Sequence, residues 1–265
     1  MAAATALKLQ IEHALESRFP AALSPVARTI REVAATGIEE ADRLLEGGFP
    51  IGAISEITGP VSSGRTSMAM AFIAQRTAEE RVCAWVDAHD AFDPESAAAN
   101  GVRLHQLLWV RCRDQGVQQT IATFKKTSSG KLKQPWTRLD QAIRATDLLL
   151  QAGGFASIVL DLGDTAPEHG CRIPLATWFR FRQAADRTRC SLLVLGKAAY
   201  AQSSAALAVE CVPMRAVTAG NAVLCGFTYE LRRGRQRFTP TMMSGRKPPA
   251  STWSVNGAWE TEKGA

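Results

Sequence analysis

The stretch EITGPVSSGRTS at residues 56–67 constrains the fold of this chain more than any other feature. Gly59 and Gly64 are separated by four residues, and a cation, Arg65, and a hydroxyl, Thr66, follow them. The apolar segment AISEITG leads into the loop, and the helical pattern RTSMAMAFIAQRTAEE follows it. A strand, a glycine loop and a helix in this order direct backbone N–H groups and the positive end of the helix at a phosphate. The spacing therefore predicts a phosphate-binding loop, with Thr66 placed to contact Mg²⁺.

Strand-like and helix-like segments alternate from about residue 37 onward. Short apolar segments typical of buried strands are VCAWVD, LLWVR, ASIVLDL and SLLVLGK. Helical patterns occur near residues 94–100 and in RLDQAIRATDLLLQAG and PLATWFRFRQAADRT. In the last of these, Trp178, Phe181 and Ala185 share one side, which predicts a buried aromatic face. The alternation predicts an α/β fold with a mostly parallel sheet that is covered on both faces.

The two ends of the chain differ from this central pattern. Residues 4–18 carry apolar side chains at helical spacing and are followed by prolines, which predicts an N-terminal helical arm at 1–35. This arm either docks on its own domain or reaches a neighbouring subunit. NAVLCGFTYELRRGRQRF predicts a C-terminal β-hairpin with a basic turn at Arg232–Arg235. The predicted domains are the arm, a core at 36–240 and a flexible tail at 241–265.

Composition and charge narrow the class of protein. The chain has 265 residues, of which 46% are hydrophobic and 21% charged, as is typical of a globular protein with a sizeable core. The formal net charge of +6 agrees with a polyanionic partner such as nucleic acid, and nearly as well with a protein that is merely basic. The six cysteines are scattered, without the close pairs of a metal or redox site, and are interpreted as small buried hydrophobes. Neither an export signal nor a membrane-spanning run is recognised, so we expect a cytoplasmic location and no membrane partner.

A second part of the predicted phosphate site lies at the end of ASIVLDL. Asp161 closes this hydrophobic strand, where a carboxylate can contact Mg²⁺ through water. The alternative is a capping or turn residue. Because the chain also holds the glycine loop, the metal role is favoured, and Thr66 and Asp161 are the predicted Mg²⁺ contacts.

Two stretches resemble a known family. TGIEEADRLLEGGFPIGAISEITGPVSSGRTS is similar to the opening of the RecA-type recombinase core, in which a Gly-Gly-x-Pro turn precedes a strand and a Ser-Ser-Gly phosphate loop. WVDAHDAFDPESAAANGVRLHQLLWVRC resembles the next segment of that family, and the resemblance runs in order over roughly residues 1–235. Within the family, the chain resembles the ImuA-like group. These are short bacterial damage-response proteins that accompany an error-prone polymerase system and often have altered ATPase motifs.

The resemblance assigns a role to single positions. Arg65 stands where the family has the lysine of its phosphate loop, and arginine keeps the charge but is bulkier and forks its hydrogen bonds. Asp93 corresponds to the family's aspartate near the adenine, and Asp87 to the aspartate that ends the strand. His89 stands where the family has the glutamate that activates the attacking water. The nucleotide-binding residues that the resemblance implies are Gly59, Ser62, Ser63, Gly64, Arg65, Thr66, Ser67 and Asp93.

The replacement at His89 has the largest consequence for the expected activity. Removing a positioned base typically costs about 10²–10⁴-fold in rate. Asp90, one residue further along, points differently on an extended segment. Together with Arg65, this predicts that ATP and Mg²⁺ bind while hydrolysis is slow or absent. No catalytic residue is therefore assigned, and residual ATPase activity is left open.

Basic residues predict contacts with DNA. A basic loop that begins at Arg111 could follow a phosphate backbone, and a nearby tryptophan could stack on a base. A solvated surface loop is the equally weighted alternative. The predicted DNA-binding residues are Lys125, Lys126, Lys131, Lys133, Trp136, Lys197, Arg232, Arg233 and Arg235. Lys197 stands at the glutamine with which the family senses the γ-phosphate. The segments that resemble the family's two mobile DNA-binding loops, GDTAPEHGCRIP and KAAYAQSSAAL, are short and carry little positive charge, which argues against strand exchange.

These expectations combine into one predicted function and two alternatives. The chain is predicted to be a RecA-like DNA-repair accessory protein that supports damage-induced translesion mutagenesis in the SOS response. Its expected partners are weakly bound single-stranded DNA, a RecA-type recombinase or the error-prone polymerase machinery, and further copies of itself. The first alternative is a DNA-dependent ATPase that acts as a homologous recombinase. The second is a nucleotide-sensing regulator unrelated to DNA.

Overall fold

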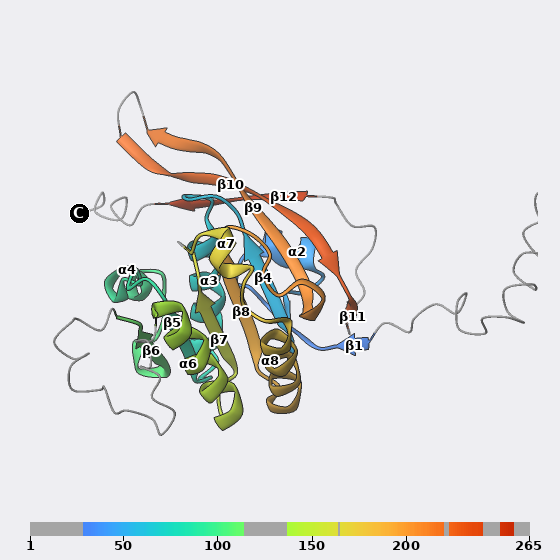
Figure 1. The fold of residues 1–265 in the computed structure, drawn as a ribbon. Helices are drawn as coiled ribbons and strands as arrows, with labels where there is room; N and C mark the ends of the chain where they lie inside the picture. Colours follow the sequence, from blue (N-terminus) through green and yellow to red (C-terminus); the bar gives the residue numbers. More distant parts are fainter. Residues whose placement is uncertain (1–28, 114–136, 164, 220–222, 241–249, 257–265) are drawn as a thin grey trace, which may run out of the picture.

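The computed structural model of the protein describes residues 29–113, 137–163, 165–219, 223–240 and 250–256. At its centre is an eight-stranded sheet (Figure 1). Its strands lie in the order β12 (Ala250–Asn256), β10 (Val223–Gln236), β9 (Ala205–Ala219), β4 (Ile54–Thr58), β8 (Ser191–Gly196), β7 (Ser157–Asp161), β5 (Cys83–Asp87) and β6 (Leu107–Arg111). The strands from β9 to β6 are parallel, whereas β10 and β12 are antiparallel to their neighbours. The predicted α/β fold with a mostly parallel sheet is confirmed.

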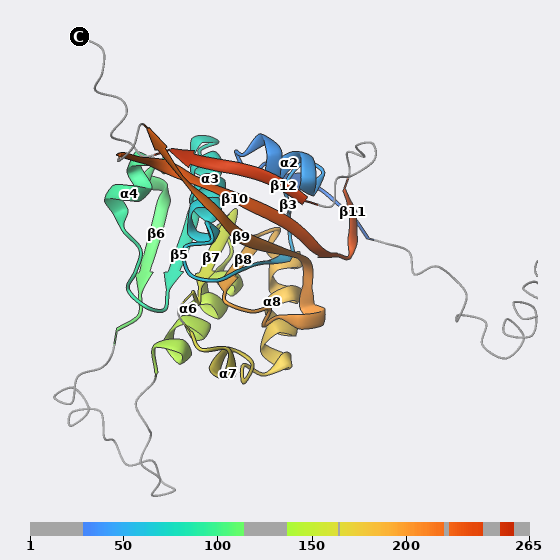
Figure 2. The same cartoon turned by 90° about the horizontal axis from the view of Figure 1, so that it is seen from above.

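Helices cover both faces of this sheet, as predicted. They are α2 (Glu39–Leu45), α3 (Arg65–Ala78), α4 (Pro94–Ala99), α6 (Arg138–Ala152), α7 (Pro167–Gly170) and α8 (Leu175–Thr188), with short 3₁₀ turns at η1 (Leu104–Gln106) and η2 (Gln202–Ser204). Figure 2 shows α2 and α3 on one side of the strands and α6 and α8 on the other. The start of α6 is fixed by a capping box between Thr137 and Asp140, and Gly153 follows its last residue with φ 71°.

The side chains of each strand divide between two hydrophobic cores. In β5, Trp85 packs into the core under α2 and α3, and Val86 into the core under α6 and α8. This alternation follows from the two-residue period of a strand whose two faces are both covered. The buried aromatic face predicted for α8 is confirmed, because Trp178, Phe181 and Ala185 are all fully buried in the second core.

Short strands attach the beginning of the described chain to the core. β1 (Thr29–Arg31) pairs in parallel with β11 (Phe238–Pro240), and β2 (Val33–Ala34) pairs with β3 (Phe49–Pro50). Part of the predicted arm at 1–35 is therefore attached to the core. The helix predicted at 4–18 lies outside the described residues.

A C-terminal β-hairpin is present, but its strands and turn differ from the prediction, because Arg232–Arg235 lie within a strand. The hairpin consists of β9 and β10, in which Val223 lies opposite Ala219 at one end and Gln236 opposite Leu207 at the other. The arginines lie inside β10: Arg232 pairs with Glu210 of β9 and Ala250 of β12, Arg233 pairs with Val209 of β9, and Arg235 lies in a register shift. A register shift between Arg233 and Gln236 accommodates the glycine that indicated a turn.

Two strands of the sheet are missing from the prediction. β9 contains Pro213, which argues against a central strand, but a register shift next to its partner Tyr229 accommodates it. β12 lies within the predicted flexible tail at 241–265 and pairs with β10 from Gly226 to Arg232. This part of the predicted tail is therefore an edge strand of the sheet.

Candidate nucleotide-binding site

The glycine loop lies where the prediction places it, between the end of β4 and the start of α3. Gly59 has φ 154°, and a Cβ there would overlap the carbonyl oxygen of Cys211 and stand 2.6 Å from Ser63 Oγ. Gly64 precedes α3 in the left-handed region, with φ 87°. Ser62 also has a positive φ, of 59°. The loop thus depends, at both Gly59 and Gly64, on backbone conformations that glycine adopts at low cost.

Two buried polar side chains of the loop fit an anion. Ser63 is 1% exposed and Arg65 is 9% exposed. Within the described residues, neither Ser63 Oγ nor Arg65 Nη1 has a hydrogen-bond partner. Buried donors are rarely left unpaired, because the unmade bond costs free energy. Both groups belong to a loop at the N-terminus of a 14-residue helix, so a phosphate group fits the donors that are present.

Arg65 extends toward the end of β7, which lies two strands from β4 in the sheet. Its Nη2 and Nη1 atoms lie 3.8 and 4.0 Å from the point where a Cβ on Gly163 would stand. On the other side, Cys211 of β9 is buried, which raises its pKa to about 12, and the nearby charge of Arg65 acts in the opposite direction. The guanidinium therefore lies above the C-terminal edge of the sheet.

The predicted contacts for Mg²⁺ lie on the same edge. Thr66 is exposed and Ser67 is half-buried in the first turn of α3. Asp161 ends β7, and its Oδ1 accepts a hydrogen bond of 2.9 Å from the backbone N–H of Gly163. Within the described residues, no group of three or more His, Cys, Asp or Glu side chains could hold a metal by itself. Mg²⁺ commonly takes one or two protein oxygens together with substrate phosphates and water, so the residues present fit it.

The strand β5 ends at Asp87, two residues before His89, the position predicted for the catalytic base. Asp87 is fully buried, and its two carboxylate oxygens accept the backbone N–H groups of His89 at 3.1 Å and Phe92 at 2.8 Å. Its carboxylate therefore holds the segment after β5. His89 is half-buried, and its carbonyl oxygen accepts a hydrogen bond of 3.4 Å from Arg138 Nη1.

The carboxylates on either side of His89 are held by other groups. Asp90 binds Arg111 through two hydrogen bonds of 2.6 and 2.8 Å, and these hydrogen bonds hold its pKa below the ordinary value. Arg111 in turn lies over the ring of Trp109, 4.6 Å from its centroid. Because Asp90 points to Arg111, it does not replace the missing glutamate in the arrangement described.

Asp93 caps α4. Its carboxylate accepts the backbone N–H groups of Glu95 and Ser96, each at 3.2 Å, and the hydroxyl of Ser96 at 2.5 Å. These hydrogen bonds, chiefly those from Ser96, lower the pKa of Asp93. Its contact with an adenine stays a prediction that depends on the resemblance.

A buried contact behind the loop is absent from the sequence analysis. Glu56, in the middle of β4, is 1% exposed, and its Oε1 accepts the backbone N–H groups of Tyr200 at 2.5 Å and Ala201 at 2.6 Å. The ring of Tyr200 fills the space beside two glycines: a Cβ on Gly170 would overlap it, and a Cβ on Gly196 would come within 2.5 Å of it. A single acidic residue inside the apolar strand AISEITG is the signal that could have indicated this contact.

Two aromatic residues of the C-terminal strands also support the loop. A Cβ on Gly64 would stand 2.9 Å from the ring of Tyr229 in β10 and 3.1 Å from that of Trp253 in β12. The two rings pack together with their centroids 5.0 Å apart. The segment predicted to be a flexible tail therefore includes a residue that packs against the phosphate loop. TWSV is a weak signal of this contact, because a tryptophan in a polar tail is usually buried.

Four of the predicted DNA-binding residues lie within the described part of the chain, Lys197 after β8 and three arginines on β10. Lys125, Lys126, Lys131, Lys133 and Trp136 lie outside the described residues, and Lys197 is exposed after β8. On β10, Arg232 binds the carboxylate of Glu230 at 3.0 Å. Arg233 donates to the Leu44 carbonyl at 3.3 Å, and Arg235 to the Gln202 carbonyl. The structure therefore gives each of these three arginines an intramolecular contact.

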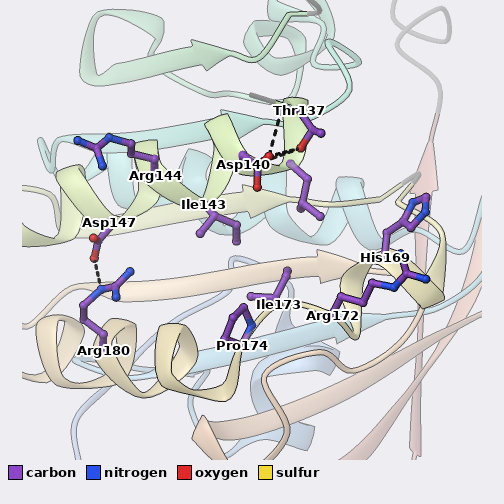
Figure 3. Close-up of a pocket in the computed structure, with 11 residues that line it drawn as sticks. Thr137, Asp140, Ile143, Arg144, Asp147, His169, Arg172, Ile173, Pro174 and Arg180 are labelled. Carbon is purple, nitrogen blue, oxygen red and sulfur yellow. Dashed lines mark hydrogen bonds and ion pairs between the residues drawn. The ribbon is translucent and has the colours of Figure 1, made fainter. Parts of the chain in front are cut away.

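A cavity of about 520 Å³ lies between α6 and α8, away from the loop (Figure 3). Its carboxylates are occupied: Asp147 accepts a hydrogen bond of 2.9 Å from Arg180, and Asp140 belongs to the α6 capping box. Figure 3 shows Ile143 and Ile173 between the two helices, with His169 and Arg172 at one end. Among the described residues that line this cavity, none belongs to the predicted site.

Comparisons with known proteins agree with the fold. The family model of the RecA N-terminal domain matches residues 27–132. Protein RecA of Borreliella afzelii is 32% identical over 138 residues, which is 52% of this chain and 31% of that protein. Protein RecA of Ruegeria pomeroyi is 36% identical over 115 residues, which is 43% of this chain and 26% of that protein. The matched region thus spans about a third or less of the length of these curated relatives.

A solved structure extends the likeness in fold. The crystal structure of the RadB recombinase superposes with a TM-score of 0.54 and 15% sequence identity, covering 84% of this chain and 96% of that one. No helix among the described residues is both long and apolar enough to span a membrane. The core of this chain is therefore RecA-like, with its sequence similarity to RecA in the part that contains the phosphate loop.

Proposed function

We propose that this chain is a RecA-like DNA-repair protein of the ImuA-like kind, which binds ATP but hydrolyses it slowly or not at all. In this proposal it supports damage-induced translesion mutagenesis in the cytoplasm. The bound nucleotide stabilises a conformation that contacts single-stranded DNA, a RecA-type recombinase or the polymerase machinery, and further copies of the chain. The similarity to RecA in sequence and to a recombinase in fold supports the DNA-repair part of the proposal.

One contrast within the site carries the proposal. The loop keeps buried donors that fit a phosphate, at Ser63 Oγ and Arg65 Nη1. At the position of the base, however, stands the imidazole of His89, and the neighbouring carboxylates of Asp87 and Asp90 are held by the backbone and by Arg111. Phosphate binding and water activation need different groups, so a site can retain the first without the second.

The residues divide the binding work as follows. Backbone N–H groups of the loop and the positive end of α3 bind the phosphates, and Arg65 forks its N–H groups to their oxygens. Thr66 and, through water, Asp161 would hold Mg²⁺, which when bound neutralises phosphate charge. Glu56 and Asp87 position the segments on either side, through backbone hydrogen bonds of 2.5–3.1 Å. His89 offers neither the negative charge nor the reach of a glutamate to orient a water molecule.

The alternative is a DNA-dependent ATPase that acts as a homologous recombinase. The overall likeness to the RadB recombinase favours it. In that case the replacements at Arg65 and His89 would be tolerated, and single-stranded DNA would stimulate hydrolysis.

Steady-state ATP hydrolysis with and without single-stranded DNA separates the two functions. We expect the natural protein to show no DNA-stimulated turnover and the double variant Arg65→Lys, His89→Glu to gain it, because the double variant restores both missing groups. The single variants are the matched controls, and we expect neither to match the double variant. Brisk DNA-stimulated turnover by the natural protein would show that the recombinase alternative is right.

A further inference from the structure

The guanidinium of Arg65 and the carboxylate of Asp161 border the same point in space. Arg65 Nη2 lies 3.8 Å from the position that a Cβ on Gly163 would take, and Asp161 Oδ1 lies 3.0 Å from that position. Asp161 is the carboxylate predicted to hold Mg²⁺. A protein cation therefore lies beside the group that would attract the metal.

This cation is buried and incompletely hydrogen-bonded. Arg65 is 9% exposed, and within the described part of the chain its Nη1 atom has no hydrogen-bond partner. A buried N–H group without a partner is costly, and phosphate oxygens are the acceptors that a planar guanidinium binds best. Ser63 Oγ, on the same loop, also has no hydrogen-bond partner among the described residues. The two donors therefore point to an anionic ligand.

A guanidinium and Mg²⁺ both stabilise a bound polyphosphate by partly neutralising its charge. Both place positive charge against phosphate oxygens, and in a buried site this attraction is weakly screened. Arginine is always charged and delivers its charge through several N–H groups in a fixed plane. Beside Asp161, the same charge weakens the attraction of that carboxylate for a second cation, because like charges repel.

We propose that Arg65 makes this a site that binds nucleoside diphosphates and triphosphates without a divalent metal. Arg65 and the loop N–H groups neutralise the phosphate charge, and Mg²⁺ adds little to the affinity. This inference rests on the proposed function, since it concerns how the same site holds its nucleotide. The inference goes further than the proposed function, because it predicts which cation nucleotide binding depends on.

Calorimetric titration of ATP and of ADP, in buffer with Mg²⁺ and in buffer with EDTA, tests this inference. For the natural protein we expect affinities in the two buffers that differ by less than about threefold, since the guanidinium fork and the loop N–H groups together bind the phosphate oxygens that the metal would otherwise contact. For Arg65→Lys we expect affinity that is about tenfold or more higher with Mg²⁺ than with EDTA, because lysine carries the same single charge but cannot hydrogen-bond several phosphate oxygens through a planar fork. Arg76→Lys is the matched control: Arg76 is also on α3, in its last turn, where it binds Glu79 at 2.5 Å. This variant should titrate like the natural protein.

Each outcome of the titrations has one meaning. Binding by the natural protein only with Mg²⁺ would overturn the inference and leave the proposed nucleotide binding intact. The absence of binding in both buffers would overturn both. Metal-independent binding by Arg65→Lys would show that the arginine is not the cause. If Arg65→Lys does not fold by circular dichroism, Asp161→Asn takes its place: an unchanged ratio of affinities supports the inference, and loss of binding only in the Mg²⁺ buffer contradicts it.

Discussion

Glu56 accepts a hydrogen bond of 2.5 Å from the backbone N–H of Tyr200. The contact joins β4, which leads into the phosphate loop, to the segment that follows β8 and begins with Lys197. The same carboxylate oxygen also accepts the N–H of Ala201 at 2.6 Å, and its other oxygen lies 4.0 Å from Arg235. One buried side chain thus holds the two segments that border the proposed nucleotide site in a fixed arrangement.

Removing this carboxylate should destabilise the fold. Glu56→Ala leaves two buried N–H groups without an acceptor, and we expect it to lower the free energy of unfolding by about 2–5 kcal/mol. Glu56→Gln keeps a carbonyl oxygen in the same place and should cost about 0.5–2 kcal/mol. Urea denaturation of the two variants measures the difference. Equal losses would show that the hydrogen bonds to Tyr200 and Ala201 do not hold the segment.

Burial of Glu56 should also make stability depend on pH. Desolvation raises its pKa above 4.5, against the hydrogen bonds from Ala201 and Tyr200 and the charge of Arg235. A raised pKa means that the folded state binds the proton more tightly, so the associated stability is present below pH 4.5 and is lost as pH rises through the folded pKa. Relative to Glu56→Gln, the free energy of unfolding of the natural protein should therefore fall from pH 4.5 upward. The urea midpoints of both proteins, compared from pH 4.5 upward, measure this difference in stability. If the natural protein became more stable than Glu56→Gln as pH rises, desolvation would not be the main influence on the pKa of Glu56.

The close packing behind the phosphate loop predicts a large cost for Gly64→Ala. The new Cβ would stand 2.9 Å from the ring of Tyr229, at a backbone with φ 87°. Gly154→Ala is the matched control, because Gly154 has φ 84° and nothing within 4 Å of its Cβ position. The control should cost about 1–2 kcal/mol for the left-handed backbone, and Gly64→Ala about 1–3 kcal/mol more for the overlap. Thermal melts compare the two, and equal costs would show that the aromatic rings yield freely.

Asp87 is predicted to act through the backbone, whereas Asp90 is not. In Asp87→Asn, an NH₂ group takes the place of one of the two carboxylate oxygens that accept backbone N–H groups. One of these hydrogen bonds is therefore lost, and we expect the free energy of unfolding to fall by about 1–3 kcal/mol. Asp90→Asn, on the exposed side of the same segment, should change the stability little, because ion pairs at the surface are weak. Denaturant unfolding of the two variants measures this contrast. A stable Asp87→Asn protein with altered nucleotide binding would instead assign Asp87 to the ligand.

Binding of single-stranded DNA should depend more on the basic loop than on the hairpin. Changing Lys125, Lys126, Lys131 and Lys133 to Gln should reduce the slope of log affinity against log salt by about 0.7 for each phosphate that is no longer neutralised. Arg232→Gln should reduce it less, because Arg232 already binds Glu230 at 3.0 Å. Fluorescence anisotropy over a salt series measures both slopes. A larger effect of Arg232→Gln would assign the DNA contact to β10.

Local sequence patterns predict the centre of this fold well, and the reason is physical. Each core strand is a short apolar run bounded by polar residues, and α6 carries both its capping box and its terminal glycine in the sequence. The glycine loop between β4 and α3 follows from two glycines at fixed spacing, because few other residues adopt φ 87°, the value at Gly64. These features depend on neighbouring residues alone.

The parts that local patterns do not predict depend on residues far apart in the sequence. β12 becomes a strand only because β10 offers it an edge, and its Trp253 finds its place against Tyr229 and Gly64. The turn predicted at Arg232–Arg235 does not form, because this segment is part of β10, which pairs with β9. Asp90 stands beside His89 in the sequence, but its pairing with Arg111 across β5 and β6 is tertiary. No local pattern contains these contacts.

Recovery of the nucleotide from the protein tests the central claim most directly. The natural protein is incubated with γ-labelled ATP, Mg²⁺ and single-stranded DNA and is then captured, and the nucleotide that it holds is identified. Retention of a phosphate site without a water-activating base predicts that ATP is recovered intact. Recovery of ADP, with labelled phosphate released promptly into solution, would contradict it.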